Sequence, residues 1–220
     1  MSQALKVDVF FDFICPWCLI GKRQLEHALE QLRIIEPQVV VEVAWHGVQL
    51  LPHLPVEGVP FAIFYKDRLG SVEAVRQRQT EVQRAAEIAG LDLDLSRLVL
   101  MPNSSDAHRL LACATPLGTT VQRDALLERL FAAYFQLGEN LSDGAILLAI
   151  AAECGYDSAL LATATSGTGH PYFAPVPNGM TRGVPHYVFD GSIHVSGAQR
   201  VEILSAALRQ ALSLRQESRA

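Results

Sequence analysis

The stretch FFDFICPWCLIGKRQLEHAL, residues 10–29, contains two cysteines with only two residues between them. Just before the cysteines, apolar side chains alternate along residues 5–11, which is typical of a strand. After them, Leu25, Leu29 and Leu32 recur at helical spacing. A second β-branched run, residues 39–45, predicts another strand. The chain is therefore predicted to open β-α-β, with the cysteine pair where the first strand meets the helix.

This junction is a favourable position for a reactive thiol. At Cys15 the helix begins, so unsatisfied backbone N–H groups and the positive end of the helix dipole favour a thiolate there. Pro16 suits the first helical position, because its missing N–H would have no intrahelical partner. Cys18 lies one turn later on the same side, within disulfide reach. Reversible thiol–disulfide exchange requires both an activated sulfur and a second sulfur nearby.

Two other interpretations of the pair are a half zinc site and an ordinary place in the core. A zinc site needs a second pair of ligands, and none of the seven histidines is at ligand spacing from another histidine or a cysteine. Cys113 and Cys154 are far apart in apolar helical segments, so we expect them to be small buried hydrophobes. Redox chemistry is therefore favoured over both alternatives, and no metal site is predicted.

Composition restricts the class of protein. Of the 220 residues, 50% are hydrophobic and 19% are charged, which is typical of a soluble globular protein. The formal net charge of −5 gives no reason to expect nucleic acid or an anionic membrane as a partner. No secretory signal is evident, and no apolar run approaches the roughly 20 residues of a membrane span. We expect a cytoplasmic protein, in which a close cysteine pair is typically catalytic or metal-binding.

The middle of the chain changes to a helical pattern without a convincing strand. Gly90 stands where the C-terminal cap of its first long helix belongs, and Ser142 is the expected N-cap of its last. The helices are predicted at residues 72–89, 106–114, 123–137 and 142–154.

A proline-rich segment follows, and no long helix is expected across Pro171, Pro175 and Pro177. Residues 187–189 and 193–195 then predict a hairpin around Asp190-Gly191. A closing amphipathic helix begins near residue 201. We therefore predict an α/β unit of residues 1–59 and 164–220, interrupted by a helical insertion of residues 60–163.

Three ordered motifs resemble one family. They are CPWC with IGKR (residues 15–18 and 20–23), PN with AHRL (102–103 and 107–110), and GVP with VFDG and VSGAQ (183–185, 188–191 and 195–199). Together they resemble the cytoplasmic DsbA-like thioredoxin-fold family, in its FrnE-like branch, whose members include 2-hydroxychromene-2-carboxylate isomerase-like proteins. The resemblance covers nearly the whole chain. It implies a thioredoxin-like fold with an inserted all-helical domain, which would form a lid beside the active site.

The resemblance also implies a cis peptide bond before Pro185, where the residues alone would favour an ordinary trans proline. Pro185 would lie across from Cys15, and the backbone of Val184 would pair with a bound peptide or thiol. Catalysis would belong to Cys15, which attacks a disulfide, and Cys18, which resolves the mixed disulfide. Pro16 and Trp17 would tune the thiolate and the surface around it.

The remaining candidates have weaker support. Many thioredoxin-fold enzymes carry a buried acid six residues before the first cysteine, where this chain has Val9. The nearest acid here is Asp12. It either aids proton transfer or is simply a polar group at the end of a strand. His186 either approaches the sulfurs or faces solvent. Asn103 and His108 enter the substrate-binding set mainly on the resemblance, and a packing role for His108 is the alternative. The proline-rich segment 168–178 departs from the family pattern.

The predicted activity is thiol–disulfide oxidoreduction on a disulfide-containing protein or a small thiol, without a cofactor but with glutathione as a candidate co-substrate. One alternative is a glutathione-dependent isomerase or kappa-class transferase, although such enzymes usually have serine at the first position of the motif and no resolving cysteine. The other alternative is a non-catalytic redox sensor. The apolar helical block is compatible with a homodimer.

Overall fold

The computed structural model describes residues 4–173 and 183–217, which fold as two units. The first comprises the described residues of 1–11, 17–46 and 174–220, and the second comprises residues 12–16 and 47–173. Cys15 and Pro16 thus belong to the second unit, whereas Trp17 and Cys18 belong to the first. The boundaries expected from the sequence, at residues 59/60 and 163/164, stay a prediction.

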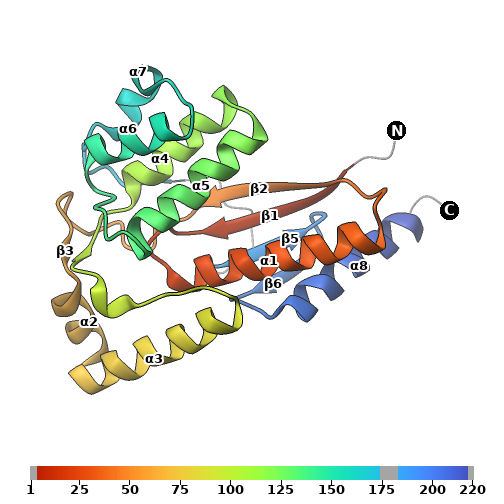
Figure 1. Cartoon of the computed structure of the whole chain (residues 1–220), viewed down its shortest axis with the longest axis horizontal. Coiled ribbons are helices and arrows are strands. Elements are labelled where there is room, and N and C mark those ends of the chain that lie inside the picture. Colours follow the sequence, from red (N-terminus) through yellow and green to blue (C-terminus); the bar gives the residue numbers. More distant parts are fainter. Residues whose placement is uncertain (1–3, 174–182, 218–220) are drawn as a thin grey trace. The chain divides into compact units, whose positions relative to one another are not determined.

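The first unit contains a four-stranded sheet in the order β2-β1-β5-β6. The arrows of β1 (Leu5–Phe11) and β2 (Val41–Gly47) point the same way in Figure 1, and α1 (Pro16–Ile35) connects them. On the other side of β1, β5 (His186–Phe189) runs antiparallel, with Val7 opposite Phe189. β6 (Ile193–Ser196) completes the sheet as the partner of β5. The predicted β-α-β opening is therefore confirmed.

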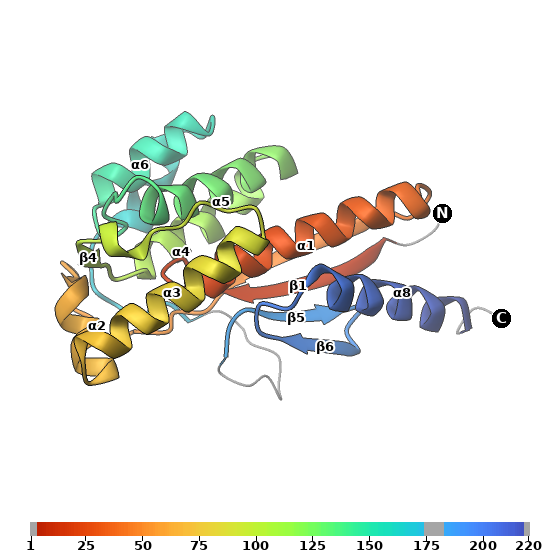
Figure 2. The same ribbon diagram turned by 60° about the horizontal axis from the view of Figure 1, so that its bottom comes forward.

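The core of this unit lies on the face of the sheet that α1 and α8 (Val201–Glu217) cover, and Figures 1 and 2 show both helices running along the sheet. Alternate residues of each strand point to this face, as strand geometry requires. A fully buried aliphatic or aromatic side chain contributes about 1.5–3 kcal/mol relative to an exposed one. The buried members of the core are Leu5, Val7, Val9, Leu25, Ala28, Leu29, Leu32, Tyr187, Phe189, Leu204, Ala207, Leu208 and Ala211.

The β5–β6 hairpin turns at Asp190 and Gly191, as predicted. Both residues have positive φ, 52° and 72°, which the favoured two-residue hairpin turn needs and which Asp-Gly adopts readily. Arg215 of α8 donates two hydrogen bonds to the Asp190 carboxylate. The turn is thereby tied to the helix that packs on the sheet.

The second unit is mostly helical, but it also contains a short ladder between β3 (Val59–Pro60) and β4 (Leu100–Met101). The expectation of no strand in this block was wrong, because two-residue strands are too short to show a period of two. The α-helices among its described residues are α2 (Phe61–Leu69), α3 (Val72–Ile88), α4 (Ser105–Ala114), α5 (Thr120–Phe135), α6 (Gly144–Glu153) and α7 (Ser158–Leu161). Short 3₁₀ helices lie at Leu95–Arg97, Thr115–Leu117 and Ala162–Thr165.

The predicted helices are confirmed, with shifted ends. α6 is capped by the Asp143 carboxylate, which accepts the N–H of Ala145. The predicted cap Ser142 instead accepts the N–H of Asn103 through its hydroxyl, at 2.8 Å. Both residues are good caps, so the sequence did not discriminate between them. None of the described helices is long and apolar enough to cross a membrane.

Candidate active site

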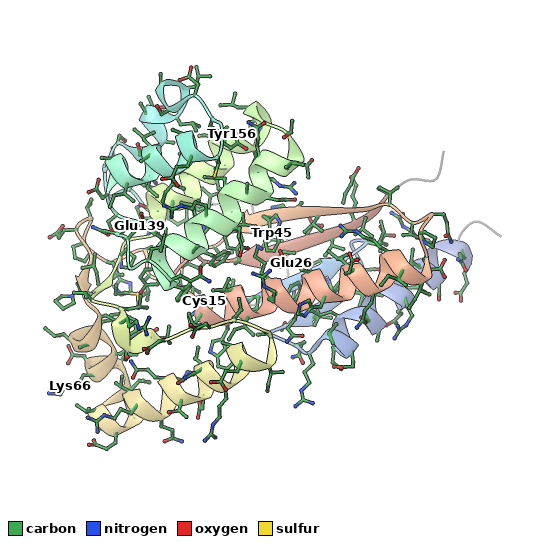
Figure 3. The ribbon with its side chains drawn as sticks, in the orientation of Figure 1. Cys15, Glu26, Trp45, Lys66, Glu139 and Tyr156 are labelled. Carbon is green, nitrogen blue, oxygen red and sulfur yellow. The ribbon has the colours of Figure 1, made fainter. Side chains whose placement is uncertain are left out.

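Cys15 immediately precedes α1, which begins at Pro16, and Figure 3 places it at the start of that helix. The first turn of α1 contains no acidic residue, so no side-chain carboxylate there opposes the positive helix end. Cys15 is 8% exposed, whereas Cys18, in the same turn, is 1% exposed. The first sulfur is therefore the more accessible one and lies at the electropositive end of the helix.

The four cysteines all lie in described residues, and no disulfide joins any of them. The expectation that Cys113 and Cys154 are buried was wrong, because Cys113 is exposed and Cys154 is half-buried. Cys113 lies off the buried face of α4, which is formed by its neighbours Leu110, Leu111 and Ala114.

The turn that leads into Cys15 is organised around Asp12, whose side chain is completely buried. One carboxylate oxygen of Asp12 accepts the N–H of Ile14, at 3.3 Å, and the other accepts the N–H of Leu50, at 2.7 Å. The backbone oxygen of Asp12 accepts the N–H of Cys15, at 3.1 Å. Asp12 therefore fixes the conformation of residues 12–15 from within the protein.

His108 is the third partner of the Asp12 carboxylate, with its Nε2 3.0 Å from Oδ1. Its ring packs against Phe13, with centroids 5.0 Å apart, and stacks on Tyr172, at 5.2 Å and an interplanar angle of 19°. A Cβ on Gly47 would come within 2.3 Å of His108 Nδ1, so only glycine fits there. The side chain of His108 is completely buried, and its place in the substrate-binding set stays a prediction.

Asn103 is also buried, at 4% exposure, and its side chain is bound within the protein. Its Oδ1 accepts hydrogen bonds from the Gln49 amide, at 2.8 Å, and from the N–H of Ser105, at 3.0 Å. Its Nδ2 donates to the backbone oxygen of Leu54, at 2.7 Å. Asn103 thus joins the segment after β2 to the start of α4, and its role in substrate binding stays a prediction.

Two tyrosines that interact with the site, Tyr65 with Cys15 and Tyr134 with Asp12, were not singled out from the sequence. Burial, and secondarily the charge of Cys15, raises the pKa of Tyr65 to about 12. Burial, and then the charges of Tyr65 and Asp12, raises the pKa of Tyr134 well above its usual value. Tyr134 donates its hydroxyl hydrogen to the backbone oxygen of Leu100, at 3.2 Å. Both phenols are neutral at pH 7, and no local sequence signal marks them, because they come from α2 and α5.

The peptide bond between Val184 and Pro185 is cis, as predicted. Within the first unit, the Pro185 ring lies against α1 at Gly21, one turn after Cys18. A Cβ on Gly21 would come within 3.0 Å of Pro185 Cγ and within 2.1 Å of Tyr187 Oη. Glycine at position 21 therefore allows β5 to approach this helix. The predicted position of Pro185 across from Cys15 and the lid role of the helical block stay predictions.

His186 points to the other face of the sheet. Tyr187 belongs to the core under α1 and α8, so the neighbouring side chain faces the opposite way. His186 Nδ1 is 2.8 Å from the Ser196 hydroxyl and Nε2 is 3.1 Å from His194 Nδ1. Burial, and then His194, lowers the pKa of His186 below its usual value. His186 is only 4% exposed, so it does not face solvent, and its approach to the sulfurs stays a prediction.

Pro16 and Trp17, the remaining proposed site residues, lie in the first turn of α1. Pro16 is buried and Trp17 is half-buried. Residues 174–182, which include Pro175 and Pro177, lie outside the described part of the chain. In the described residues, no three His, Cys, Asp or Glu side chains form a group that could hold a metal ion.

One family model matches this chain, and several solved structures share its fold. The model of the DSBA-like thioredoxin domain family matches residues 6–171. The crystal structure of a probable DsbA oxidoreductase, SCO1869 from Streptomyces coelicolor, has a TM-score of 0.78 at 25% identity, covering 95% of this chain and 90% of that one.

Two further solved structures share the fold at 16% identity. A 2-hydroxychromene-2-carboxylate isomerase has a TM-score of 0.61, covering 96% of this chain and 98% of that one. The cytosolic disulfide reductase DsbM from Pseudomonas aeruginosa, solved with GSH, has a TM-score of 0.57, covering 98% and 100%. The predicted fold class, thioredoxin-like with a helical insertion, is confirmed.

Proposed function

Because this chain belongs to the DSBA-like thioredoxin domain family, we propose that it is a thiol–disulfide oxidoreductase in which Cys15 and Cys18 exchange electrons with a protein or small-molecule disulfide. The observation that carries the proposal is the position of the two cysteines at the start of α1. Cys15 lies at the positive end of the helix and is the more exposed of the two, which suits a nucleophile. Cys18 is buried one turn away, which suits a resolving thiol.

The reaction proceeds in two exchanges. The Cys15 thiolate attacks one sulfur of the substrate disulfide, the S–S bond breaks, and the leaving sulfur takes up a proton. The Cys18 thiolate then attacks Cys15 Sγ in this mixed disulfide and releases the second substrate thiol. Two electrons pass from the protein to the substrate, and Cys15–Cys18 is left as a disulfide. The reverse sequence oxidises a substrate dithiol.

The substrate is proposed to pair with the backbone of Val184, beside Pro185. Glutathione is the proposed small co-substrate, consistent with the GSH in the DsbM structure that shares this fold. It would re-reduce the Cys15–Cys18 disulfide and leave as oxidised glutathione. The cytoplasmic location and the homodimer stay predictions.

The test is reduction of insulin or of glutathione disulfide by the dithiothreitol-reduced protein. Cys15→Ser is expected to abolish turnover, whereas Cys18→Ser is expected to accumulate mixed disulfides detectable by mass spectrometry. Cys113→Ser, a change at an exposed thiol of α4, is the matched control and should turn over normally. Undiminished reductase activity in Cys15→Ser would reject the proposal.

Glutathione-dependent isomerisation is the second candidate, because a 2-hydroxychromene-2-carboxylate isomerase shares the fold over nearly the whole chain. The presence of Cys18 favours electron transfer instead, since isomerisation needs no resolving thiol. Isomerisation of a chromene carboxylate with glutathione, undiminished in Cys18→Ser, would favour this second function. A redox sensor would oxidise slowly and show negligible turnover in both assays.

A further inference from the structure

The first unit contains a cavity of about 470 Å³ between the C-terminal part of α1 and α8, which Figure 1 shows beside α1. Cys18 lies in the first turn of α1, so the cavity is at the other end of that helix. Its volume is within the range of pockets that hold small molecules. The helical residues of its lining recur at the spacing of one helix face, 28, 31, 32 and 35 on α1 and 205, 208, 209, 212, 213 and 216 on α8. The cavity therefore lies between two facing stripes of side chains.

The floor of the cavity is apolar. Four of its lining residues belong to the hydrophobic core of the unit and are 5% exposed or less, namely Leu5, Ala28, Leu32 and Leu208. A hydrocarbon group that enters such a space leaves water and gains contacts with the lining atoms. The floor thus suits the apolar part of a ligand.

Exposed apolar side chains continue this surface to the solvent. Ile35 and Val40 line the cavity and are 64% and 63% exposed, respectively. Exposed apolar surface that is continuous with a pocket is typical of a binding site. Ser205 and Gln31, also in the lining, join the two helices, since the Ser205 hydroxyl donates to Gln31 Oε1 at 3.1 Å. The walls of the cavity are thereby connected to each other.

The charged side chains of the lining favour one negative charge on the ligand. Arg209 is exposed, and among the described residues no acidic side chain pairs with its guanidinium. Arg215 also lines the cavity, but it donates two hydrogen bonds to the Asp190 carboxylate. Glu36, the acidic residue in the described lining, accepts a hydrogen bond from Gln38 at 2.6 Å. One arginine is thus available to bind an anion, and Glu36 opposes a second negative charge.

We propose that this cavity binds a medium-chain monocarboxylate, a hydrocarbon chain that ends in one carboxylate, as in a free fatty acid. The chain would lie against the floor, and Arg209 would bind the carboxylate at the solvent end. The inference goes beyond the proposed redox function, since no thiol takes part in it. It rests on charge complementarity at the opening and on the apolar floor beneath it.

The experiment is calorimetric titration of the full chain with hexanoate, octanoate and decanoate at low ionic strength, where charge effects are largest. Decanoate is expected to bind with a dissociation constant below about 1 mM. Each added methylene group should tighten binding about fourfold, as burial of a CH₂ group does. A dissociation constant above this limit, or an affinity independent of chain length, would overturn the inference.

Two variants test the charges in opposite directions. Arg209→Gln is expected to weaken decanoate binding about three- to tenfold, whereas Glu36→Gln should strengthen it about two- to threefold. Binding of octan-1-ol, which has no charge, should stay within about twofold in both variants. Arg200→Gln, a change at an exposed arginine just before α8 and outside the described lining, is the matched control and should bind decanoate as wild type does. Equal decanoate affinities in Arg209→Gln, Glu36→Gln and wild type would overturn the assignment of the carboxylate site.

A further variant tests the place of the hydrocarbon chain. Ser205→Leu adds apolar volume on the α8 side of the cavity and is expected to weaken decanoate binding at least about tenfold. If this variant does not fold, nuclear Overhauser effects in the wild-type protein decide. Contacts from the decanoate methyl group to Ala28 and Leu208 are expected, and contacts confined to residues outside the cavity would overturn the inference.

The outcome is independent of the proposed function. Cys15→Ser/Cys18→Ser is expected to bind decanoate as tightly as wild type, because neither cysteine lines the cavity. A protein that binds decanoate in this way but reduces no disulfide would reject the proposed function alone. A protein that reduces disulfides but binds no decanoate would reject this inference alone.

Discussion

Gly21 of α1 and Pro185 are in such close approach that a Cβ on the glycine would come within 3.0 Å of the proline Cγ. The same Cβ would come within 2.1 Å of the hydroxyl of Tyr187, a fully buried side chain. A methyl group therefore requires β5 or α1 to move. This contact joins the helix that bears Cys18 to the strand that follows the proposed substrate-binding residues.

Gly21→Ala is expected to destabilise the protein by about 1–3 kcal/mol, as overpacking a well-packed interior does. Insulin reductase activity should fall as well, since Pro185 would be displaced. Urea unfolding of both proteins measures the first effect. Gly183→Ala is the control, because no atom of the described residues apart from its chain neighbours lies within 4 Å of the added Cβ, and its stability should change by less than about 0.5 kcal/mol.

Tyr65→Phe is expected to slow alkylation of Cys15 by iodoacetamide at pH 7 about three- to tenfold. The neutral phenol is a hydrogen-bond donor near the Cys15 charge, and hydrogen bonds to a thiolate favour it. Activity should drop in parallel. Both proteins should also carry Cys18→Ser, Cys113→Ser and Cys154→Ser, so that Cys15 is the only cysteine left to be alkylated. An equal alkylation rate with and without the hydroxyl would refute this role for Tyr65.

The raised pKa of Tyr65 predicts that the stability of the fold depends on pH in the alkaline range. Its pKa is raised to about 12 in the folded protein from an ordinary value of 10, so the unfolded chain loses this proton first. The free energy of unfolding should therefore decrease as the pH rises from 10 to 12. Tyr65→Phe should show a smaller decrease over this window, measured by urea unfolding at each pH. A variant with the same slope as wild type would contradict the prediction.

His186→Asn is expected to reduce the sensitivity of the fold to acid. The pKa of His186 is lowered in the folded protein, chiefly by burial, so the unfolded chain binds this proton more readily. Its contribution to stability is complete above about pH 6.5 and is lost as the pH falls through the lower folded pKa. Denaturant unfolding at pH 7.5 and pH 5 measures the difference. His27→Gln, a change at an exposed position of α1, should behave as wild type.

Gly47→Ala tests whether the ring of His108 must stay where it is. The added Cβ would approach His108 Nδ1 to 2.3 Å and Tyr172 Cε1 to 3.0 Å. We expect a loss of about 1–3 kcal/mol in the free energy of unfolding, measured by urea unfolding. A variant as stable as wild type would show that the ring of His108 can shift without cost.

Much of the fold and the core of the candidate site could be predicted because the signals are local. The period of two before Cys15 and the helical spacing after it determined that the cysteines meet the start of α1. Asp190-Gly191 marked the hairpin, because few other dipeptides adopt two positive φ values readily. Helix ends were less certain, since Ser142 and Asp143 are both good caps and only one starts α6.

The surroundings of the cysteines depend on the tertiary structure. His108 contacts Asp12 across 96 positions of sequence, and no spacing rule predicts that contact. The face to which His186 points follows from the register of β5 beside β1, where a shift of one residue would reverse it. The sequence by itself determined which groups carry the chemistry. Only the folded chain decided which buried charges and hydroxyls stand near Cys15, because electrostatic interactions depend on distance in space and on the exclusion of water.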